Sequence, residues 1–118
     1  MSSVLLVEDE FLIRTVLVDA LAEVGLACIE APTGQAALDV MTGAAPLSAI
    51  IVDIGLPDMS GERVIEAAAR YRPGTPIIRC SGTLEHADAR SPGVHVFSKP
   101  YSAVELSKFV ASLVTAGS

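Results

Sequence analysis

The sequence lacks any uninterrupted apolar run long enough to cross a membrane, although 51% of its 118 residues are hydrophobic. A membrane-spanning helix needs about 20 consecutive apolar residues. The N-terminus also lacks the basic segment, apolar stretch and small-residue cleavage site of a secretory signal. We therefore expect a soluble, cytoplasmic protein with no membrane partner. We expect a chain of this length to form a single domain over residues 1–118 with a core of its own.

Basic residues and cysteines are both scarce. Eight Lys and Arg stand against 14 Asp and Glu, and the resulting net charge of -6 disfavours direct binding to nucleic acid, whose phosphates would be repelled. Cys28 and Cys80 form no C-x-x-C pair, and His86 and His95 are not at metal-ligand spacing from them. We expect two reduced cysteines in the core. The sequence also lacks a G-x-G-x-x-G motif, which argues against a dinucleotide site.

What is present is an alternation of short apolar runs and helical patterns. The apolar runs predict strands over residues 4–7, 27–31, 48–53, 76–80 and 94–98. The helical patterns predict helices over residues 11–24, 33–42, 62–71 and 102–116, with a short, weakly specified helix over 84–91. Thr33, Ser60 and Ser102 are placed to cap three of these helices. This order predicts an α/β fold, (βα)5, with a doubly wound five-stranded parallel sheet and a shortened fourth helix.

Polar residues follow the apolar runs, at the points where the predicted strands end. They are Glu8 and Asp9 after the first strand, Asp53 at the end of the third, Ser81 and Gly82 after the fourth, and Lys99 and Pro100 after the fifth. In open parallel sheets the ligand site lies at the carboxyl ends of the strands. The fold would therefore collect these groups at one edge.

The carboxylates in this group predict a cation site. Packed carboxylates repel one another, and a hard divalent cation relieves the repulsion. Oxygen ligands select Mg²⁺, with Mn²⁺ as the alternative. Asp53 could then act as a nucleophile that forms an acyl phosphate, with Lys99 and the Ser81 hydroxyl binding the phosphoryl oxygens. Singly, these residues also have purely structural interpretations, since Asp53 could cap the loop that follows it.

Four stretches together resemble the receiver domain of two-component response regulators, a flavodoxin-like signalling family. They are "VLLVEDE", "IIVDIGLPDMSG", the Ser81-Gly82 pair and "VFSKPY", and the resemblance covers essentially the whole chain. It implies strand order 2-1-3-4-5 and a role in a bacterial His-Asp phosphorelay. Asp53 would accept a phosphoryl group from a sensor histidine kinase or histidine phosphotransferase. The domain would then change conformation to control a protein target that the sequence does not identify, and it would not itself be an enzyme.

The same resemblance implies roles for the other polar residues. Asp9 would bind Mg²⁺ directly together with Asp53, Glu8 would act on it through water, and Gly55 would offer its backbone carbonyl. The phosphoryl group would be bound by Ser81, Gly82 and Lys99. The peptide bond before Pro100 would be cis.

The sequence departs from the usual receiver pattern at three places. Val96 stands where receivers usually carry an aromatic switch residue, and strand alternation should point the nearby Phe97 to the other face of the sheet. The spacing from Ser81 to Lys99 is short, which is why the fourth helix should be stunted. Gly55 stands where many receivers carry a larger residue.

Two other functions are consistent with this fold. One is a receiver-like docking module that is never phosphorylated. The other is an aspartyl-phosphate hydrolase, although such enzymes need a second Asp where this chain has Gly55. A flavodoxin-type cofactor carrier is disfavoured because Glu8 and Asp9 would repel its phosphate. The chain could be a stand-alone receiver or part of a larger protein such as a hybrid kinase.

Overall fold

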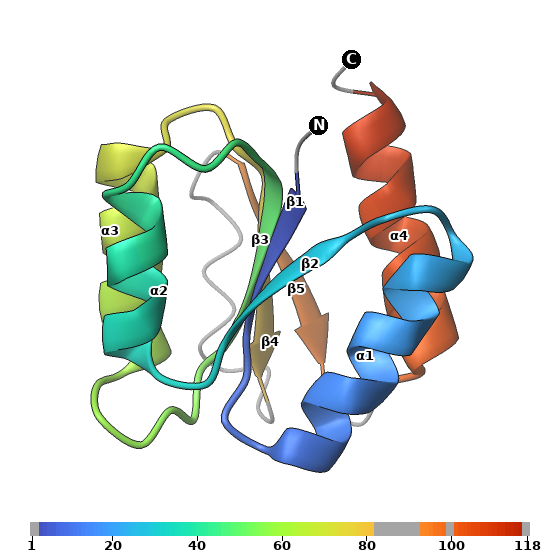
Figure 1. The fold of residues 1–118 in the computed structure, drawn as a ribbon, viewed down its shortest axis with the longest axis horizontal. Coiled ribbons are helices and arrows are strands. Elements are labelled where there is room, and N and C mark those ends of the chain that lie inside the picture. The colour runs from blue at the N-terminus through green and yellow to red at the C-terminus, as the bar shows by residue number, and fades with distance from the viewer. Residues whose placement is uncertain (1–2, 82–92, 99–100, 117–118) are drawn as a thin grey trace.

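The computed structural model describes residues 3–81, 93–98 and 101–116, and it forms a parallel sheet with helices on both faces (Figure 1). The strands are β1 (Ser3–Val7), β2 (Cys28–Ala31), β3 (Leu47–Asp53), β4 (Ile77–Ser81) and β5 (Val94–Ser98). Their order in the sheet is β2-β1-β3-β4-β5, and every neighbouring pair is parallel. The predicted fold class and strand order are confirmed.

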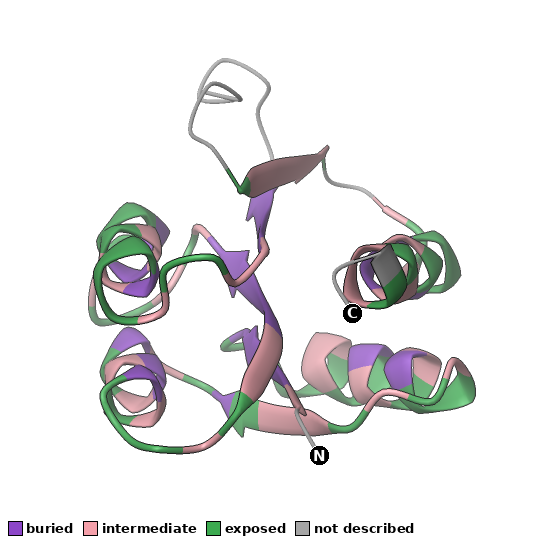
Figure 2. Ribbon diagram, turned by 90° about the horizontal axis from the view of Figure 1, so that it is seen from above, coloured by how far each residue is buried: buried purple, intermediate pink, exposed green. Residues whose placement is uncertain are grey.

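The helices form two layers, one on each side of the sheet (Figure 2). Helices α1 (Phe11–Glu23) and α4 (Ala103–Ala116) cover one face, while α2 (Gly34–Met41) and α3 (Gly61–Tyr71) cover the other. The strands supply both cores because alternate side chains point to opposite faces: Leu6 packs in the α1/α4 core and Leu5 in the α2/α3 core. In Figure 1, β1 begins and α4 ends at the upper edge, opposite the edge where α1 and α2 begin.

The predicted helix caps are present. The backbone N–H of Ala36 donates to Thr33 Oγ1 at 3.0 Å at the start of α2. Ser60 Oγ accepts from the N–H of Arg63 at 3.4 Å, and Ser102 Oγ accepts from the N–H of Glu105 at 3.3 Å. These side chains satisfy amides that the first turn of a helix leaves without a partner.

One predicted strand is displaced by a residue. The fourth strand was expected over 76–80, but β4 runs from Ile77 to Ser81. Pro76 has no N–H to donate, and it enters the sheet only through its carbonyl, which accepts from Ile50 N at 2.9 Å. At the other end Ser81 pairs with Ser98 of β5. The other boundaries agree with prediction to within about one residue.

Some expectations lie outside the described residues. They are the shortened helix over 84–91, the phosphoryl-binding roles of Gly82 and Lys99, and the cis bond before Pro100. Within the part of the chain that the structure describes, no helix has the length and apolar character needed to cross a membrane.

Neither cysteine takes part in a disulfide bond in the structure. Cys80 is buried, and Cys28 is half-buried against the α1/α4 core. Burial, together with the nearby charge of Glu30, raises the pKa of the Cys28 thiol to about 11. That thiol therefore stays protonated at neutral pH and is a poor nucleophile.

Arg72 fastens the C-terminal end of α2. Its guanidinium donates to the backbone carbonyls of Met41 at 2.9 Å, Ala45 at 2.7 Å, Gly43 at 2.9 Å and Val40 at 3.3 Å. The last carbonyls of a helix lack partners within the helix and carry partial negative charge. A single side chain from the end of α3 thus closes α2 and the connection that follows it.

We expect Arg72→Lys to lower the free energy of unfolding by about 1–3 kcal/mol, because an ammonium cannot reproduce the planar fork of donors and leaves partly buried carbonyls without a partner. Denaturant unfolding monitored by circular dichroism measures this loss. Arg70→Lys is the matched control, since Arg70 is exposed beside the Tyr71 ring, and its effect should stay within about 0.5 kcal/mol. Equal losses in the two variants would contradict the role given to Arg72.

Candidate functional site

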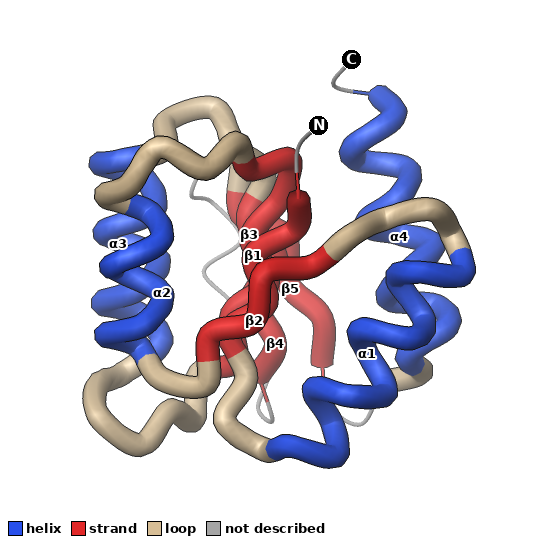
Figure 3. Tube along the Cα trace, viewed as in Figure 1, coloured by secondary structure: helices blue, strands red, loops and turns tan. Residues whose placement is uncertain are grey.

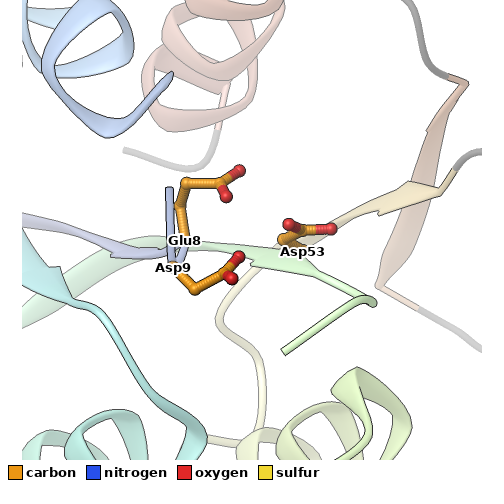
Figure 4. A group of neighbouring side chains, drawn as sticks. All are labelled: Glu8, Asp9 and Asp53. Carbon is orange, nitrogen blue, oxygen red and sulfur yellow. The ribbon is translucent and has the colours of Figure 1, made fainter. Parts of the chain in front are cut away.

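Three carboxylates meet at the carboxyl edge of the sheet (Figure 4). Glu8 and Asp9 directly follow β1, and Asp53 is the last residue of β3, the neighbour of β1 in the sheet. One oxygen from each of the three carboxylates lies within 4.8 Å of the others. Glu8 is 1% exposed and Asp53 is 6% exposed, whereas Asp9 is open to solvent. The structure therefore brings together the three carboxylates, as the sequence predicted.

Backbone and side-chain contacts shape the turn after β1. The N–H of Glu10 donates to Glu8 Oε2 at 3.1 Å, which turns the Glu8 carboxylate back onto its own loop. Arg14, on the first turn of α1, donates from Nη1 to the Glu8 carbonyl at 3.0 Å and from Nε to Glu30 Oε1 at 2.9 Å. Glu8 is therefore held in place, while Asp9 remains accessible.

The chain turns sharply after Asp53. The N–H of Gly55 donates to Asp53 Oδ1 at 3.2 Å, and a Cβ on Gly55 would meet nothing within 4 Å. The glycine there is not required by packing. Gly61 is different, since a Cβ would lie 2.6 Å from Ile54 Cα and 2.8 Å from the Asp53 carbonyl oxygen. A side chain at Gly61 would push directly on the backbone that carries Asp53.

Ser81 ends β4 next to this group. Asp53 pairs with Cys80 in the sheet, so Ser81 lies one residue beyond the level of Asp53, and it is 5% exposed. A buried charge precedes it on the same strand: Arg79 is paired in register with Val52 and Val96, and its Nη2 forms an ion pair with Glu62 Oε2 at 3.0 Å. No periodic pattern in the sequence marks this arginine as buried.

The side chains of β5 alternate as predicted. The Phe97 ring packs against Phe109 of α4 with 5.2 Å between centroids, whereas Val94 packs with the α2/α3 core. Val96 follows the alternation of Val94. The aromatic ring nearest to the switch position thus lies on the opposite face of the sheet.

Tyr101 is a neighbour of the site that no pattern in the sequence singles out beyond its place in "VFSKPY". Burial raises the pKa of its hydroxyl above the ordinary range, and electrostatic interactions with Cys80, Glu8 and Asp53 raise it further. The hydroxyl therefore stays protonated at neutral pH. Its ring packs edge-on against Phe97 at 6.4 Å between centroids. Tyr101 is thus an uncharged residue packed against the α1/α4 core.

Several known proteins are similar to this chain. A protein-glutamate methylesterase/protein-glutamine glutaminase of Halobacterium salinarum is 34% identical over 98% of this chain, which spans only 35% of that protein's length. A response regulator receiver protein of Sinorhizobium medicae shares the fold, with a TM-score of 0.87, 24% identity, and coverage of 99% of this chain and 97% of that one. So does the receiver domain of sensor histidine kinase PA1611 of Pseudomonas aeruginosa, solved with magnesium in its active-site cleft. Its TM-score is 0.81 at 22% identity, over 97% of this chain and 98% of that one.

The family model described as "Response regulator receiver domain" matches residues 4–111, nearly the whole chain. The chain therefore belongs to the response regulator receiver domains of two-component signalling.

Proposed function

We propose that this domain is a phosphoacceptor that takes a phosphoryl group on Asp53 in the presence of Mg²⁺. The observation that carries the proposal is the acidic cluster itself, in which Glu8, Asp9 and Asp53 bring carboxylate oxygens within 4.8 Å of one another. Three like charges held this close repel one another, and a bound cation would relieve that repulsion. The accessible position of Asp9 leaves room for the cation to enter.

The donor set fits a hard divalent cation. Carboxylate and carbonyl oxygens suit Mg²⁺ or Mn²⁺ and do not suit softer metals. Asp9 and Asp53 would hold the ion directly, the Gly55 carbonyl would complete the protein ligands, and Glu8 would act through water because its oxygen already accepts from Glu10 N. When bound, the cation would neutralise charge on the phosphoryl oxygens. The magnesium in the PA1611 receiver domain supports this assignment.

Transfer of the phosphoryl group to Asp53 would be a substitution at phosphorus. An oxygen of Asp53 attacks the phosphorus of a phosphohistidine, and an oxygen–phosphorus bond forms. The phosphorus–nitrogen bond breaks, and its electron pair stays on the imidazole of the donor. A sensor histidine kinase or histidine phosphotransferase would supply that phosphohistidine. Ser81, Gly82 and Lys99 would bind the phosphoryl oxygens once they are on Asp53.

Two alternatives differ from this proposal in measurable ways. A docking module that is never phosphorylated would carry the same fold and use the edge only to bind a partner. An aspartyl-phosphate hydrolase would release phosphate over many turnovers. The second lacks support here because Gly55 stands two residues after Asp53, where such an enzyme needs an acid.

The proposal predicts that a small phosphodonor labels the protein only when Mg²⁺ is present. Intact-mass spectrometry should show a gain of one phosphoryl group, which hydroxylamine removes because acyl phosphates react with it. Asp53→Asn should abolish the gain. Asp39→Asn is the control, since Asp39 is an exposed carboxylate on α2 that contacts only Gln35 among its described hydrogen bonds.

Each alternative has its own outcome in that experiment. A folded protein that binds Mg²⁺ and takes no label would be a docking module. Label that persists unchanged in Asp53→Asn would place the acceptor elsewhere. Release of many equivalents of phosphate per protein would indicate a hydrolase.

The two acids after β1 should contribute unequally to cation binding. We expect Asp9→Asn to weaken Mg²⁺ binding by about a hundredfold and Glu8→Gln by about tenfold, because Asp9 is accessible and Glu8 is buried against its own loop. Isothermal titration calorimetry measures both. The isosteric variants preserve packing, and removing either charge should raise the thermal stability of the metal-free protein by relieving repulsion. A larger loss of affinity for Glu8→Gln would reverse the two roles.

A further inference from the structure

The connection between β3 and α3 carries Gly55 and is fastened at its base. The N–H of Gly61 donates to the Ile54 carbonyl at 3.1 Å, and the absence of a Cβ on Gly61 lets the two ends of the connection touch. Residues between them project from the sheet edge as a loop, which passes beside the first turn of α2 (Figure 3).

The tip of this loop is fastened to α2 by a second contact. Asp58 Oδ1 accepts from the N–H of Gly34 at 2.8 Å, and its Oδ2 accepts from the N–H of Gln35 at 2.9 Å. Both oxygens of one carboxylate are thus used on consecutive amides. These amides, Gln35 foremost, hold the pKa of the Asp58 carboxyl below its ordinary value, so the carboxylate is charged at neutral pH.

The side chain of Met59, the residue after Asp58, lies directly against Gly34 at the start of α2. A Cβ on Gly34 would lie 2.7 Å from the sulfur of Met59, so the glycine leaves room for this side chain against the start of α2. Met59 also packs against the α2/α3 core. The tip of the loop is therefore held by a charge-assisted contact and by packing together.

Gly55 lies between these two anchors, and its neighbour Leu56 adds a further attachment by packing against the α2/α3 core. Gly55 is exposed, and its surroundings are open where a side chain would be. Its one described hydrogen bond runs to Asp53 Oδ1, which belongs to the carboxylate that would accept the phosphoryl group. That hydrogen bond occupies an Asp53 oxygen that the phosphoryl group or the cation would also need. The direction of the Gly55 carbonyl must then be set by the way the loop is anchored.

We propose that Asp58 is a positioning residue for the cation site. By binding the first two amides of α2, it holds the loop in the conformation that presents the Gly55 carbonyl to the cation. This inference rests on the proposed function, since it assumes a cation at the carboxylates. It also makes α2 part of the site, because coupling between two sites is reciprocal. A cation on the Gly55 carbonyl should tighten the bonds between Asp58 and α2.

A purely structural cap would behave differently. Thr33 already caps α2 through Ala36 N, and Asp58 could simply add to this. A cap would change the stability of the domain and leave the cation affinity of the folded protein unchanged. Cation affinity therefore separates the two roles.

The test compares Asp58→Ala, Asp58→Asn and the control Asp39→Asn with the natural sequence. Mg²⁺ is titrated by calorimetry in about 0.5 M KCl, where long-range charge effects are screened, on proteins shown by circular dichroism to be folded. We expect Asp58→Ala to bind about tenfold more weakly, Asp58→Asn to lie between because its amide oxygen keeps one bond, and Asp39→Asn to be unchanged. Asp58→Asn and Asp39→Asn remove the same charge, so their difference reports the lost contact.

Hydrogen exchange provides the second readout. In the natural protein Mg²⁺ should slow exchange of the Gly34 and Gln35 amides, and in Asp58→Ala it should not. Unchanged Mg²⁺ affinity in Asp58→Ala, with only a loss of stability, would overturn the inference and leave Asp58 as a helix cap. Failure of the natural protein itself to bind Mg²⁺ would instead overturn the proposed function.

Discussion

Repulsion among the carboxylates of Glu8, Asp9 and Asp53 is the constraint around which this edge of the domain is built. Parallel strands place their carboxyl ends together, so acids that end two neighbouring strands cannot avoid one another. The turns offset part of the cost, because the amides of Glu10 and Gly55 donate to the two buried carboxylates. A bound divalent cation would relieve the repulsion that remains. Under the proposed function, the same charges that repel one another in the metal-free fold would hold the cation.

Helix α2 shows how opposite charges can hold a short element at both ends. The Asp58 carboxylate accepts hydrogen bonds from amides at the N-terminal end of α2, and Arg72 donates to carbonyls at the C-terminal end of α2 and just beyond it. Each charge therefore matches the dipole of the helix. Both come from the segments that flank α3. Helix α2 is therefore tied to the loop beside the carboxylates at one end and to the opposite edge at the other.

Local patterns predicted the elements and their order. Apolar runs, caps at Thr33 and Ser60, and acids after strands are all features of short stretches of sequence, and the structure has them where expected. Contacts between distant segments were not predicted. Arg72 binds carbonyls about thirty residues before it, and Asp58 binds amides more than twenty residues before it. Such contacts depend on how loops fold over neighbouring helices, which neither periodicity nor spacing encodes. The burial of Arg79 could not be predicted either, because it depends on an ion pair with Glu62 of α3, a distant residue in the sequence.

The placement of the two chain ends has a consequence for longer proteins that contain this domain. Strand β1 begins and α4 ends at the edge opposite the carboxylates (Figure 1). Any segment that continued the chain from either end would be attached at that far edge. Under the proposed function, such a segment would leave the acidic edge open to the phosphohistidine donor. A change at the carboxylates could reach that segment only through the sheet and its helices. The acidic edge and the point of attachment would therefore lie on opposite sides of the domain.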